Sequence, residues 1–419
     1  MLKFKRFFKA IGPGFITGSA DDDPSGIATY AQTGAQFGYT QLWFALFVTP
    51  FMIAVQEMCG RIGLVTGRGL SGVIRTHYGK PLLLSVVSLL LVANTVNIGA
   101  DLGAMAASAE LVFGLPFAVW LIVMTVGTLL LEVFIPYRVY VKFLKYLTLS
   151  LLAYVLAAFA VTQPWWTILK ATLIPAFSFS EGSLMNIVAL FGTTVSPYLF
   201  FWQADEEVEE EVAHHRIRGF GFGRPYFRSS DLADMRTDTA VGMCFSNLIT
   251  FFIITTAAST LGAGGIRVVA TADQAALALR PLAGDFAYLL FALGIIGTGL
   301  LAVPVLAGSA SYALSEAFGW KEGLYRKFSQ AHGFYGVMTL ATFLGLLVNF
   351  TGLPPFRVLY FAAVLNGIVA PILLFVILQI ANNATVMGKN VNGRVSNVLG
   401  WMITVMMALA SVSLIKPFL

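Results

Sequence analysis

Three consecutive aspartates at residues 21–23 lie in the middle of an otherwise apolar segment, and they constrain this chain more than any other feature. A charged side chain at the depth of a bilayer is costly, so it persists only where it faces protein, water or a counter-ion. Pro24, Ser25 and Gly26 follow directly, and they break a helix and free backbone carbonyls that can bind a cation. An acidic, unwound break in mid-membrane therefore predicts a cation site.

The composition places this segment in a membrane. Of the 419 residues, 58% are hydrophobic and only 11% are charged, whereas a soluble domain has about 25% charged residues. About eleven segments are apolar over the roughly 20 residues that a helix needs to cross a bilayer. We predict spans at residues 11–37 (broken), 41–65, 82–113, 115–134, 139–162, 184–204 (broken), 239–262, 286–315, 333–351, 356–382 and 396–415.

The basic residues indicate the orientation. With the N-terminus in the cytoplasm, 21 of the 26 Lys and Arg residues fall on the inner side, as the positive-inside rule requires. The net charge of +5 is then a consequence of topology, and it gives no reason to expect a nucleic-acid partner. The basic residues left on the outer side are Lys170, Arg267, Arg280, Arg357 and Lys416.

A second anomaly lies in the sixth span, at residues 192–203. It contains a glycine, the small hydroxyl side chains of Thr193, Thr194 and Ser196, and Pro197 near mid-membrane. The two broken spans start units that are five spans apart, so the second unit is inverted relative to the first. Paired breaks in inverted halves indicate a transporter site at the midplane. For Pro197 alone, the ordinary tolerance of proline in membrane helices is an equally good explanation, but the three carboxylates favour a site.

The chain resembles the Nramp family of divalent-metal transporters over essentially its whole length. Residues 12–14 match the family's Gly-Pro-Gly, and residues 23–26 match its Asp-Pro-Gly-Asn signature in part. Residues 192–203 fit the sixth-span signature Gly-Ala-x-Val-Met-Pro-His-Asn-Leu-Tyr-Leu-His, and residues 307–319 resemble the end of the eighth span. The resemblance implies an all-α polytopic membrane protein with the leucine-transporter-type 5+5 inverted repeat and about 11 transmembrane helices, the first and sixth of them broken.

On that pattern the chain divides into a short N-terminal segment, two repeats and an added helix. The expected parts are a basic cytoplasmic N-terminus (1–10), a first five-helix repeat (11–162), an extracellular loop (163–183), a second, inverted repeat (184–382) with a cytoplasmic charged loop (205–236), and an eleventh helix (383–419).

The chain departs from the family pattern at the metal site. Asp23 keeps the family's metal-binding carboxylate, but Gly26 stands where the ligand Asn is expected. Ser196 replaces the Met, and Tyr198 and Gln203 replace the two sixth-span His residues. A thioether favours soft transition ions, whereas Mg²⁺ takes hard oxygen donors. The substitutions therefore favour a partly hydrated Mg²⁺.

The groups that the family uses for a coupled proton also differ. Asp101 aligns with the family's third-span Glu, and Ile98 stands at the position of its proton-path Asp. The ninth span, 333–351, contains no Arg, although the family's proton path includes one. These losses resemble the Nramp-related magnesium transporters, and they imply uptake of Mg²⁺, with Mn²⁺ also accepted, by alternating access without proton coupling.

The candidate site follows from these features. Asp23 is expected to bind the ion directly or through water; the alternative is that it caps the half-helix that follows. At least one of Asp21 and Asp22 is expected to face an aqueous vestibule and to attract cations. Asp101 must face a polar interior, where a structural hydrogen bond is the alternative. The hydroxyls of Thr194 and Ser196 either bind the ion or pack helices. The resemblance adds, by position, Gly26, Tyr198, Gln203, Asn366 and the carbonyls of Ala20 and Thr193.

Other acidic residues have ordinary explanations. Glu57 and Glu132 lie near the cytoplasmic ends of their spans, close to Arg61 and Arg138, where surface ion pairs explain them. The acidic run 205–211 is expected to extend the sixth helix into the cytoplasm as a solvated face, because its spacing matches no ligand set.

These features imply a monomeric transporter in the cell membrane that contacts lipid, with divalent cations as cargo and no cofactor. A proton-coupled Mn²⁺/Fe²⁺ carrier remains an alternative, as does a carrier of amino-acid-type organic substrates on the same fold. Three carboxylates at the site disfavour the latter, since such carriers hold a substrate carboxylate at positive half-helix ends. A channel would show unsaturable flux, and an enzyme is disfavoured because no nucleophile–base pattern is present.

Overall fold

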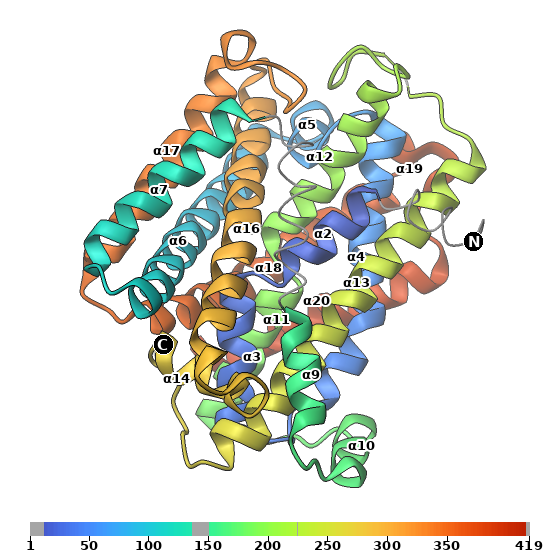
Figure 1. Cartoon of the computed structure of the whole chain (residues 1–419). Helices are drawn as coiled ribbons and strands as arrows, with labels where there is room; N and C mark the ends of the chain where they lie inside the picture. The colour runs from blue at the N-terminus through green and yellow to red at the C-terminus, as the bar shows by residue number, and fades with distance from the viewer. Residues whose placement is uncertain (1–11, 136–150, 224, 416–419) are drawn as a thin grey trace, which may run out of the picture.

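The protein is an all-helical bundle in a computed structural model that describes residues 12–135, 151–223 and 225–415 (Figure 1). Within these residues there is no β-strand, only an isolated bridge between Gly219 and Phe222. The α-helices are α2 (Pro13–Asp21), α3 (Pro24–Phe37), α4 (Trp43–Thr66), α5 (Leu70–His77), α6 (Lys80–Phe113), α7 (Phe117–Phe134), α9 (Leu152–Ala160), α10 (Trp165–Leu173), α11 (Glu181–Thr194), α12 (Pro197–Ala213), α13 (Ser229–Ala257), α14 (Ala272–Ala276), α15 (Arg280–Ala283), α16 (Ala287–Phe318), α17 (His332–Val348), α18 (Pro355–Asn382), α19 (Ala384–Met387) and α20 (Arg394–Ile415).

The predicted spans match these helices closely. In the described parts of the chain, nine helical segments are long and apolar enough to cross a membrane. The broken first span is not counted among them, because its halves α2 and α3 have only 9 and 14 residues. The first half of the predicted fifth span, 139–150, lies outside the described residues, as do the N-terminal segment 1–10 and Arg138; its second half contains α9. The prediction of an all-α polytopic membrane protein is confirmed.

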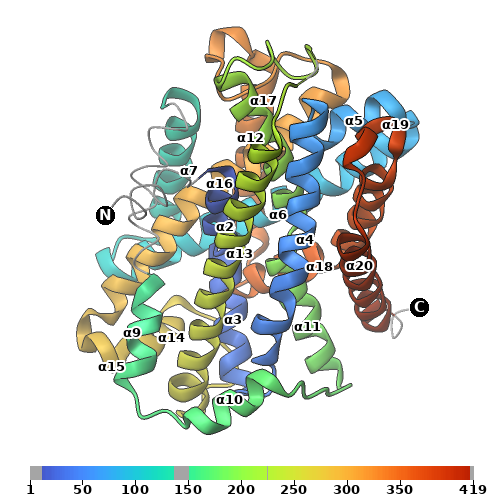
Figure 2. The ribbon, with the colours of Figure 1, turned by 90° about the vertical axis from the view of Figure 1, so that its right-hand side faces the viewer.

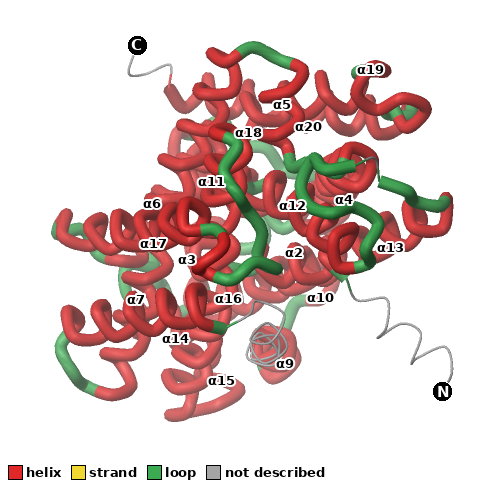
Figure 3. The backbone as a smooth tube through the Cα atoms, turned by 90° about the horizontal axis from the view of Figure 1, so that it is seen from above, coloured by secondary structure: helices red, strands yellow, loops and turns green. Residues whose placement is uncertain are grey.

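The two broken spans occupy the middle of the bundle. Viewed along the helices, α2, α3 and α12 lie inside a ring that includes α6, α16, α13 and α4 (Figure 3). Helix α6 packs on α16, α17 and α18, and α7 lies outside α6 and α17 (Figure 1). At the opposite side, α20 packs along α18 (Figure 2). Both breaks are therefore shielded from lipid by other helices.

The two ends of the bundle differ in charge. Helices α5, α12 and α19 lie towards one end, which we call the α5 end, and α3, α10 and α11 lie towards the other (Figure 2). The basic stretches 61–80, 214–223, 225–228 and 321–327 all belong to the α5 end (Figures 1 and 2). The positive-inside rule associates such an end with the cytoplasm.

Small residues allow the central helices to approach closely. A Cβ on Gly192 of α11 would collide with the backbone of Ala363 and Gly367 in α18. A Cβ on Gly18 of α2 would likewise collide with the backbone of Gly242 in α13. Close backbone contact through small residues is the usual means of helix association in membranes. These contacts hold each broken span against an unbroken helix.

Candidate metal centre

The two helix breaks meet in the middle of the bundle. Helix α2 ends at Asp21 and α3 begins at Pro24, while α11 ends at Thr194 and α12 begins at Pro197. The hydroxyl of Tyr198 donates a hydrogen bond to the carbonyl oxygen of Ala20 across the gap, at 2.8 Å. A Cβ on Gly26 would stand 3.1 Å from Thr193 Oγ1. The structure thus brings together residues from the first and sixth spans that the sequence separates by about 170 positions.

Asp23 caps helix α3. Its Oδ1 accepts hydrogen bonds from the Gly26 amide at 2.7 Å and from Ser25 Oγ at 2.8 Å. Its Oδ2 accepts one from Asn97 Nδ2 at 3.0 Å. A carboxylate oxygen has lone pairs for a further partner, so the cap leaves Oδ2 able to face a cation. The capping alternative is therefore realised, and it is compatible with a ligand role.

Asp21 and Asp22 are both buried, with 0% and 1% of their surfaces exposed. Our expectation that one of them faces an aqueous vestibule is wrong for this conformation. Ser246 Oγ in α13 donates to Asp21 Oδ2 at 2.6 Å and lies 3.3 Å from Asp22 Oδ1. One hydroxyl has one proton to donate, so it cannot satisfy both. Asp21 Oδ1 and Asp22 Oδ2 have no hydrogen-bond partner in the described chain.

Helix α6 presents three polar side chains on one face. Asn94 donates to the Leu306 carbonyl at 2.9 Å, and Asn97 donates to Asp23. Asp101 lies beside the Ser25 amide and close to Asp23. Neither of its buried oxygens has a hydrogen-bond partner of normal geometry among the described residues. A structural role for Asp101 would rest on the Ser25 amide beside it.

The sixth-span hydroxyls divide into partnered and unpartnered groups. Thr194 Oγ1 donates to the Leu190 carbonyl, and Ser196 Oγ lies 2.8 Å from both the Gly192 and the Thr193 carbonyls. Thr193 Oγ1 is buried and has no partner in the parts of the chain that the structure describes. We predicted the carbonyl of Thr193 as a ligand; that oxygen shares the Ser196 hydroxyl with the Gly192 carbonyl and keeps a lone pair for a further partner.

Two further candidates differ in their distance from the breaks. Gln203 is two turns into α12, about 10 Å along the axis from Ser196 at 1.5 Å per residue, and donates to Glu207 at 3.0 Å. Asn366 is buried in α18 beside Gly367, which packs against Gly192 near the end of α11. Its Nδ2 has no hydrogen-bond partner among the described residues.

Sequence reasoning missed Asn97 and Ser246. Asn94, Asn97 and Asp101 are spaced by three and four residues, which places them on one face of a helix, so Asn97 carried a readable signal. Ser246 carried none, because its role depends on how α13 docks against α2.

The arrangement suits a cation held by mixed oxygen ligands. Within the described residues, no three or more His, Cys, Asp or Glu side chains are close enough together to hold a metal ion. An ion at the breaks would therefore need carbonyl, hydroxyl, amide or water oxygens beside the carboxylates. The buried oxygens without a hydrogen-bond partner in the described chain include, at the breaks and on α6, Asp21 Oδ1, Asp22 Oδ2, Asn97 Oδ1, Asp101 Oδ1, Asp101 Oδ2 and Thr193 Oγ1.

The Gly12-Pro13-Gly14 segment fastens α2 to α13. Asp238 accepts hydrogen bonds from the amides of Gly12 at 3.0 Å, Gly14 at 2.7 Å and Phe15 at 3.4 Å. These amides have no partner within the helix, and a carboxylate there is favoured by the helix dipole. Asp238 therefore fixes the entry of the first broken span.

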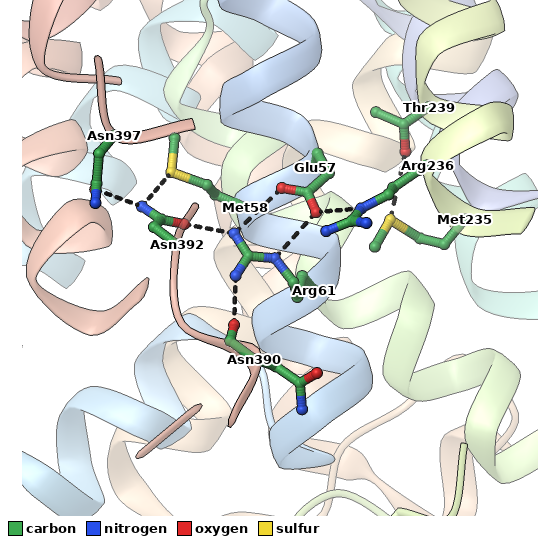
Figure 4. Close-up of polar contacts among 9 residues, drawn as sticks. All are labelled: Glu57, Met58, Arg61, Met235, Arg236, Thr239, Asn390, Asn392 and Asn397. Carbon is green, nitrogen blue, oxygen red and sulfur yellow. Dashed lines mark hydrogen bonds and ion pairs between the residues drawn. The ribbon is translucent and has the colours of Figure 1, made fainter. Parts of the chain in front are cut away.

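Glu57 and Arg61 form a buried network, not a surface ion pair (Figure 4). Their exposed fractions are 7% and 2%. Glu57 Oε1 binds Arg61 Nε at 3.0 Å and Arg236 Nε at 2.9 Å. Arg61 also donates to the carbonyl of Asn390 and the side chain of Asn392. The expected ion pair of Glu57 with Arg61 is present, but its expected surface position is wrong, because α13 and the segment before α20 cover this part of α4.

Glu132 is also buried, with 4% of its surface exposed. Its Oε2 lies 3.4 Å from Thr342 Oγ1 in α17, and Arg138 lies outside the described residues. The expected surface position of Glu132 is therefore wrong.

The acidic run does extend the sixth helix, since α12 continues to Ala213. The expected solvated face is wrong, because most of these side chains are buried between α12 and its neighbours. The buried members are Asp205, Glu206, Glu207, Glu209 and Glu211.

The model of one protein family matches nearly the whole chain. It is described as Nramp, natural resistance-associated macrophage protein-like, and it matches residues 14–416. The chain belongs to the Nramp family. It is thus a multi-pass membrane protein of a family of metal-ion transporters, and not an enzyme.

Solved structures show the same fold. The manganese transporter of Eremococcus coleocola, in complex with an aromatic bis-isothiourea-substituted compound, is similar with a TM-score of 0.75 and 17% identity. That match covers 99% of this chain and 87% of that chain. Mhp1, a nucleobase-cation-symport-1 family transporter in a closed conformation with bromovinylhydantoin bound, has a TM-score of 0.55 and 11% identity, over 97% and 93% of the two chains. The leucine-transporter-type fold is confirmed.

Proposed function

We propose that this Nramp-family protein imports Mg²⁺, and accepts Mn²⁺, by alternating access without a coupled proton. The unpartnered oxygens around the two breaks carry this proposal, because an unsatisfied buried carboxylate is costly and a cation would satisfy it. Asp23 Oδ2, Asp101 and Thr193 Oγ1 would contribute directly or through water. The donors are hard oxygens, and Mg²⁺ binds such ligands while it keeps several waters.

Contacts at Ile98 support uncoupled transport. Ile98 is fully buried in α6, and a Cβ on Gly345 of α17 would stand 2.6 Å from Ile98 Cγ2. The resemblance associates this position with an acidic proton-path residue, and an isoleucine cannot hold a proton. At this position Ile98 of α6 packs against Gly345 of α17, whereas a proton relay would need a polar side chain there.

The direction of transport would follow the membrane potential. We place the α5 end and the N-terminus in the cytoplasm of a cell-membrane protein that acts as a monomer, and we take residues 11–162 and 184–382 as the two rocking repeats. A charge crossing the membrane gains about 2.3 kcal/mol per 100 mV, so a divalent ion gains about 4.6 kcal/mol. Accumulation then needs no proton gradient.

A second candidate is a proton-coupled Mn²⁺/Fe²⁺ carrier. The Eremococcus coleocola relative is described as a manganese transporter. Met105 Sδ and Pro24 Cγ both lie near the position that a Cβ of Gly299 would occupy, at 2.5 Å and 3.4 Å. A thioether thus lies near the first break, and thioethers favour soft transition ions. Replacement of Met105 by Leu should impair this carrier and leave a magnesium importer largely unchanged.

Transport by the purified full-length protein in liposomes tests the proposal. A Mg²⁺ dye, quenching by Mn²⁺ and an internal pH dye should show saturable entry of both ions at constant pH. Asp23→Asn keeps an acceptor for the Gly26 amide and removes the charge, so uptake should fall at least tenfold while the protein stays folded. Asp285→Ala removes an exposed carboxylate and should leave uptake unchanged. Mn²⁺ entry with acidification and without Mg²⁺ entry would establish the second candidate instead.

A further inference from the structure

A second group of carboxylates gathers at the α5 end, away from the helix breaks. Its members come from the far half of α12, the end of α16 and the loop that follows α16. Each is buried, with 9% or less of its surface exposed. The group consists of Asp205, Glu206, Glu209, Glu316 and Glu322.

Two members have clear structural partners. Glu316 accepts hydrogen bonds from the Gly69 and Gly72 amides, each at 2.7 Å, and so caps helix α5. Glu209 Oε1 accepts from Tyr312 Oη at 2.5 Å and from the Leu324 amide at 2.6 Å. Both carboxylates are held in place as acceptors of these hydrogen bonds.

Asp205 has no such partner. Only 1% of its surface is exposed, and neither oxygen has a hydrogen-bond partner in the described chain. Its strongest electrostatic neighbours are four other carboxylates, with Glu316 first. A buried charge without a partner is strongly destabilising, so Asp205 must be neutralised by a proton or by a cation. Arg68 and Arg75 act on its neighbour Glu316, but no arginine of the described chain bonds Asp205 itself.

Asp205 and Glu316 both approach Gly69. Glu316 Oε2 lies 2.6 Å from the position that a Cβ of Gly69 would occupy, and Asp205 Oδ1 lies closer still. The two oxygens are therefore no more than twice that distance apart. Mg²⁺ holds oxygens at about 2.1 Å, so two of its ligands stand roughly 3 to 4 Å apart. Small rotations would allow one ion to contact both oxygens.

A hydrated ion fits this pair better than a bare one. No set of three or more His, Cys, Asp or Glu side chains in the described residues could enclose a metal ion. Mg²⁺ is commonly bound through one or two carboxylates while waters fill the other positions. A cavity of about 1050 Å³ is lined by Glu206 and Glu209 of this group, and Asp205 and Glu316 lie outside its lining.

We propose that Asp205 and Glu316 form a second cation site, which takes a partly hydrated divalent cation at the α5 end. The ion would link α12, the second half of a broken span, to α16 and to the α5 helix that Glu316 caps. Occupancy would hold α12 in place and slow the movement that opens this end. The binding itself does not depend on whether the helix breaks transport Mg²⁺ or Mn²⁺.

Binding of Mn²⁺ to the full-length protein in detergent tests this site, since free and bound Mn²⁺ differ in their electron paramagnetic resonance signals. The wild type should bind two ions that Mg²⁺ displaces. Asp205→Asn keeps the shape of the side chain, and it should lower the affinity for one ion at least tenfold. Glu210→Gln removes a half-exposed carboxylate from the same helix and should leave both ions bound.

The Asp23→Asn background separates this site from the helix breaks. In that variant Mg²⁺ should still raise the unfolding temperature, and addition of Asp205→Asn should abolish the rise. If Asp205→Asn binds as many ions as the wild type with unchanged affinity, the second site does not exist. Loss of an ion in Asp23→Asn alone concerns only the transport site.

Discussion

At the scale of single residues, adjacent threonines offer a sharp test of the metal centre. Thr193 Oγ1 has no partner in the described chain and lies near Gly26, whereas Thr194 Oγ1 donates to the Leu190 carbonyl. Thr193→Val should raise the half-saturating Mg²⁺ concentration roughly tenfold, equivalent to about 1.4 kcal/mol. It should not lower stability, because it removes an unsatisfied hydroxyl.

Thr194→Val is the matched control, because it is the same substitution at the next residue of the same helix. Its half-saturating Mg²⁺ concentration in the liposome assay should stay within about twofold of the wild type. Equal effects of the two substitutions would show that the hydroxyls only pack the helices.

The residues of the candidate metal centre differ in how well the sequence predicts them. Asp23 and its helix break were predictable, because a carboxylate before Pro is a local capping signal. The partner Asn97 was partly readable from its spacing to Asp101. Ser246 was not, since a contact over 225 positions depends on docking that no local pattern encodes.

At the scale of elements, the packing of α2 on α13 controls the first broken span. A Cβ at Gly18 would meet the backbone of Gly242, which cannot rotate away. Gly18→Ala should therefore lower the unfolding temperature in detergent, with an overpacking cost of about 1 to 3 kcal/mol. Gly127→Ala in α7, where a Cβ meets nothing within 4 Å, should cause no loss. An unchanged unfolding temperature for Gly18→Ala would mean that α2 is loosely held.

Elements also explain where sequence reasoning failed. The run 205–211 has the composition of a solvated helix face, yet α12 packs against α4, α5 and α16. Some of its buried carboxylates have partners from outside the helix: Glu209 accepts hydrogen bonds from Tyr312 and from the Leu324 amide, and Glu211 pairs with Arg216. The pattern of apolar and polar residues within 205–211 does not indicate which groups of other elements lie against it, so the burial of these side chains could not be predicted from the sequence.

At the scale of the whole molecule, the architecture was predictable from hydropathy and from the two breaks. Span-length apolar segments predicted most helices within a few residues, as with 356–382 against Pro355–Asn382. The exceptions are α13, which begins ten residues before the predicted 239, and α12, which continues nine residues beyond the predicted 204. The spacing of the breaks indicated the inverted repeat, because each break interrupts the first helix of its unit. Which faces meet was not predictable, since nearly every face of these helices is apolar.

The whole-molecule charge balance gives the last prediction. An uncoupled carrier of a divalent ion must respond to voltage, because about 4.6 kcal/mol per 100 mV corresponds to more than three decades of accumulation. In liposomes with a potassium diffusion potential, negative inside, Mg²⁺ uptake should rise steeply with voltage. A pH gradient of one unit at zero potential should drive none. Accumulation driven by that pH gradient alone would require a proton relay despite the apolar contact of Ile98 with Gly345, and would place this protein among the coupled carriers.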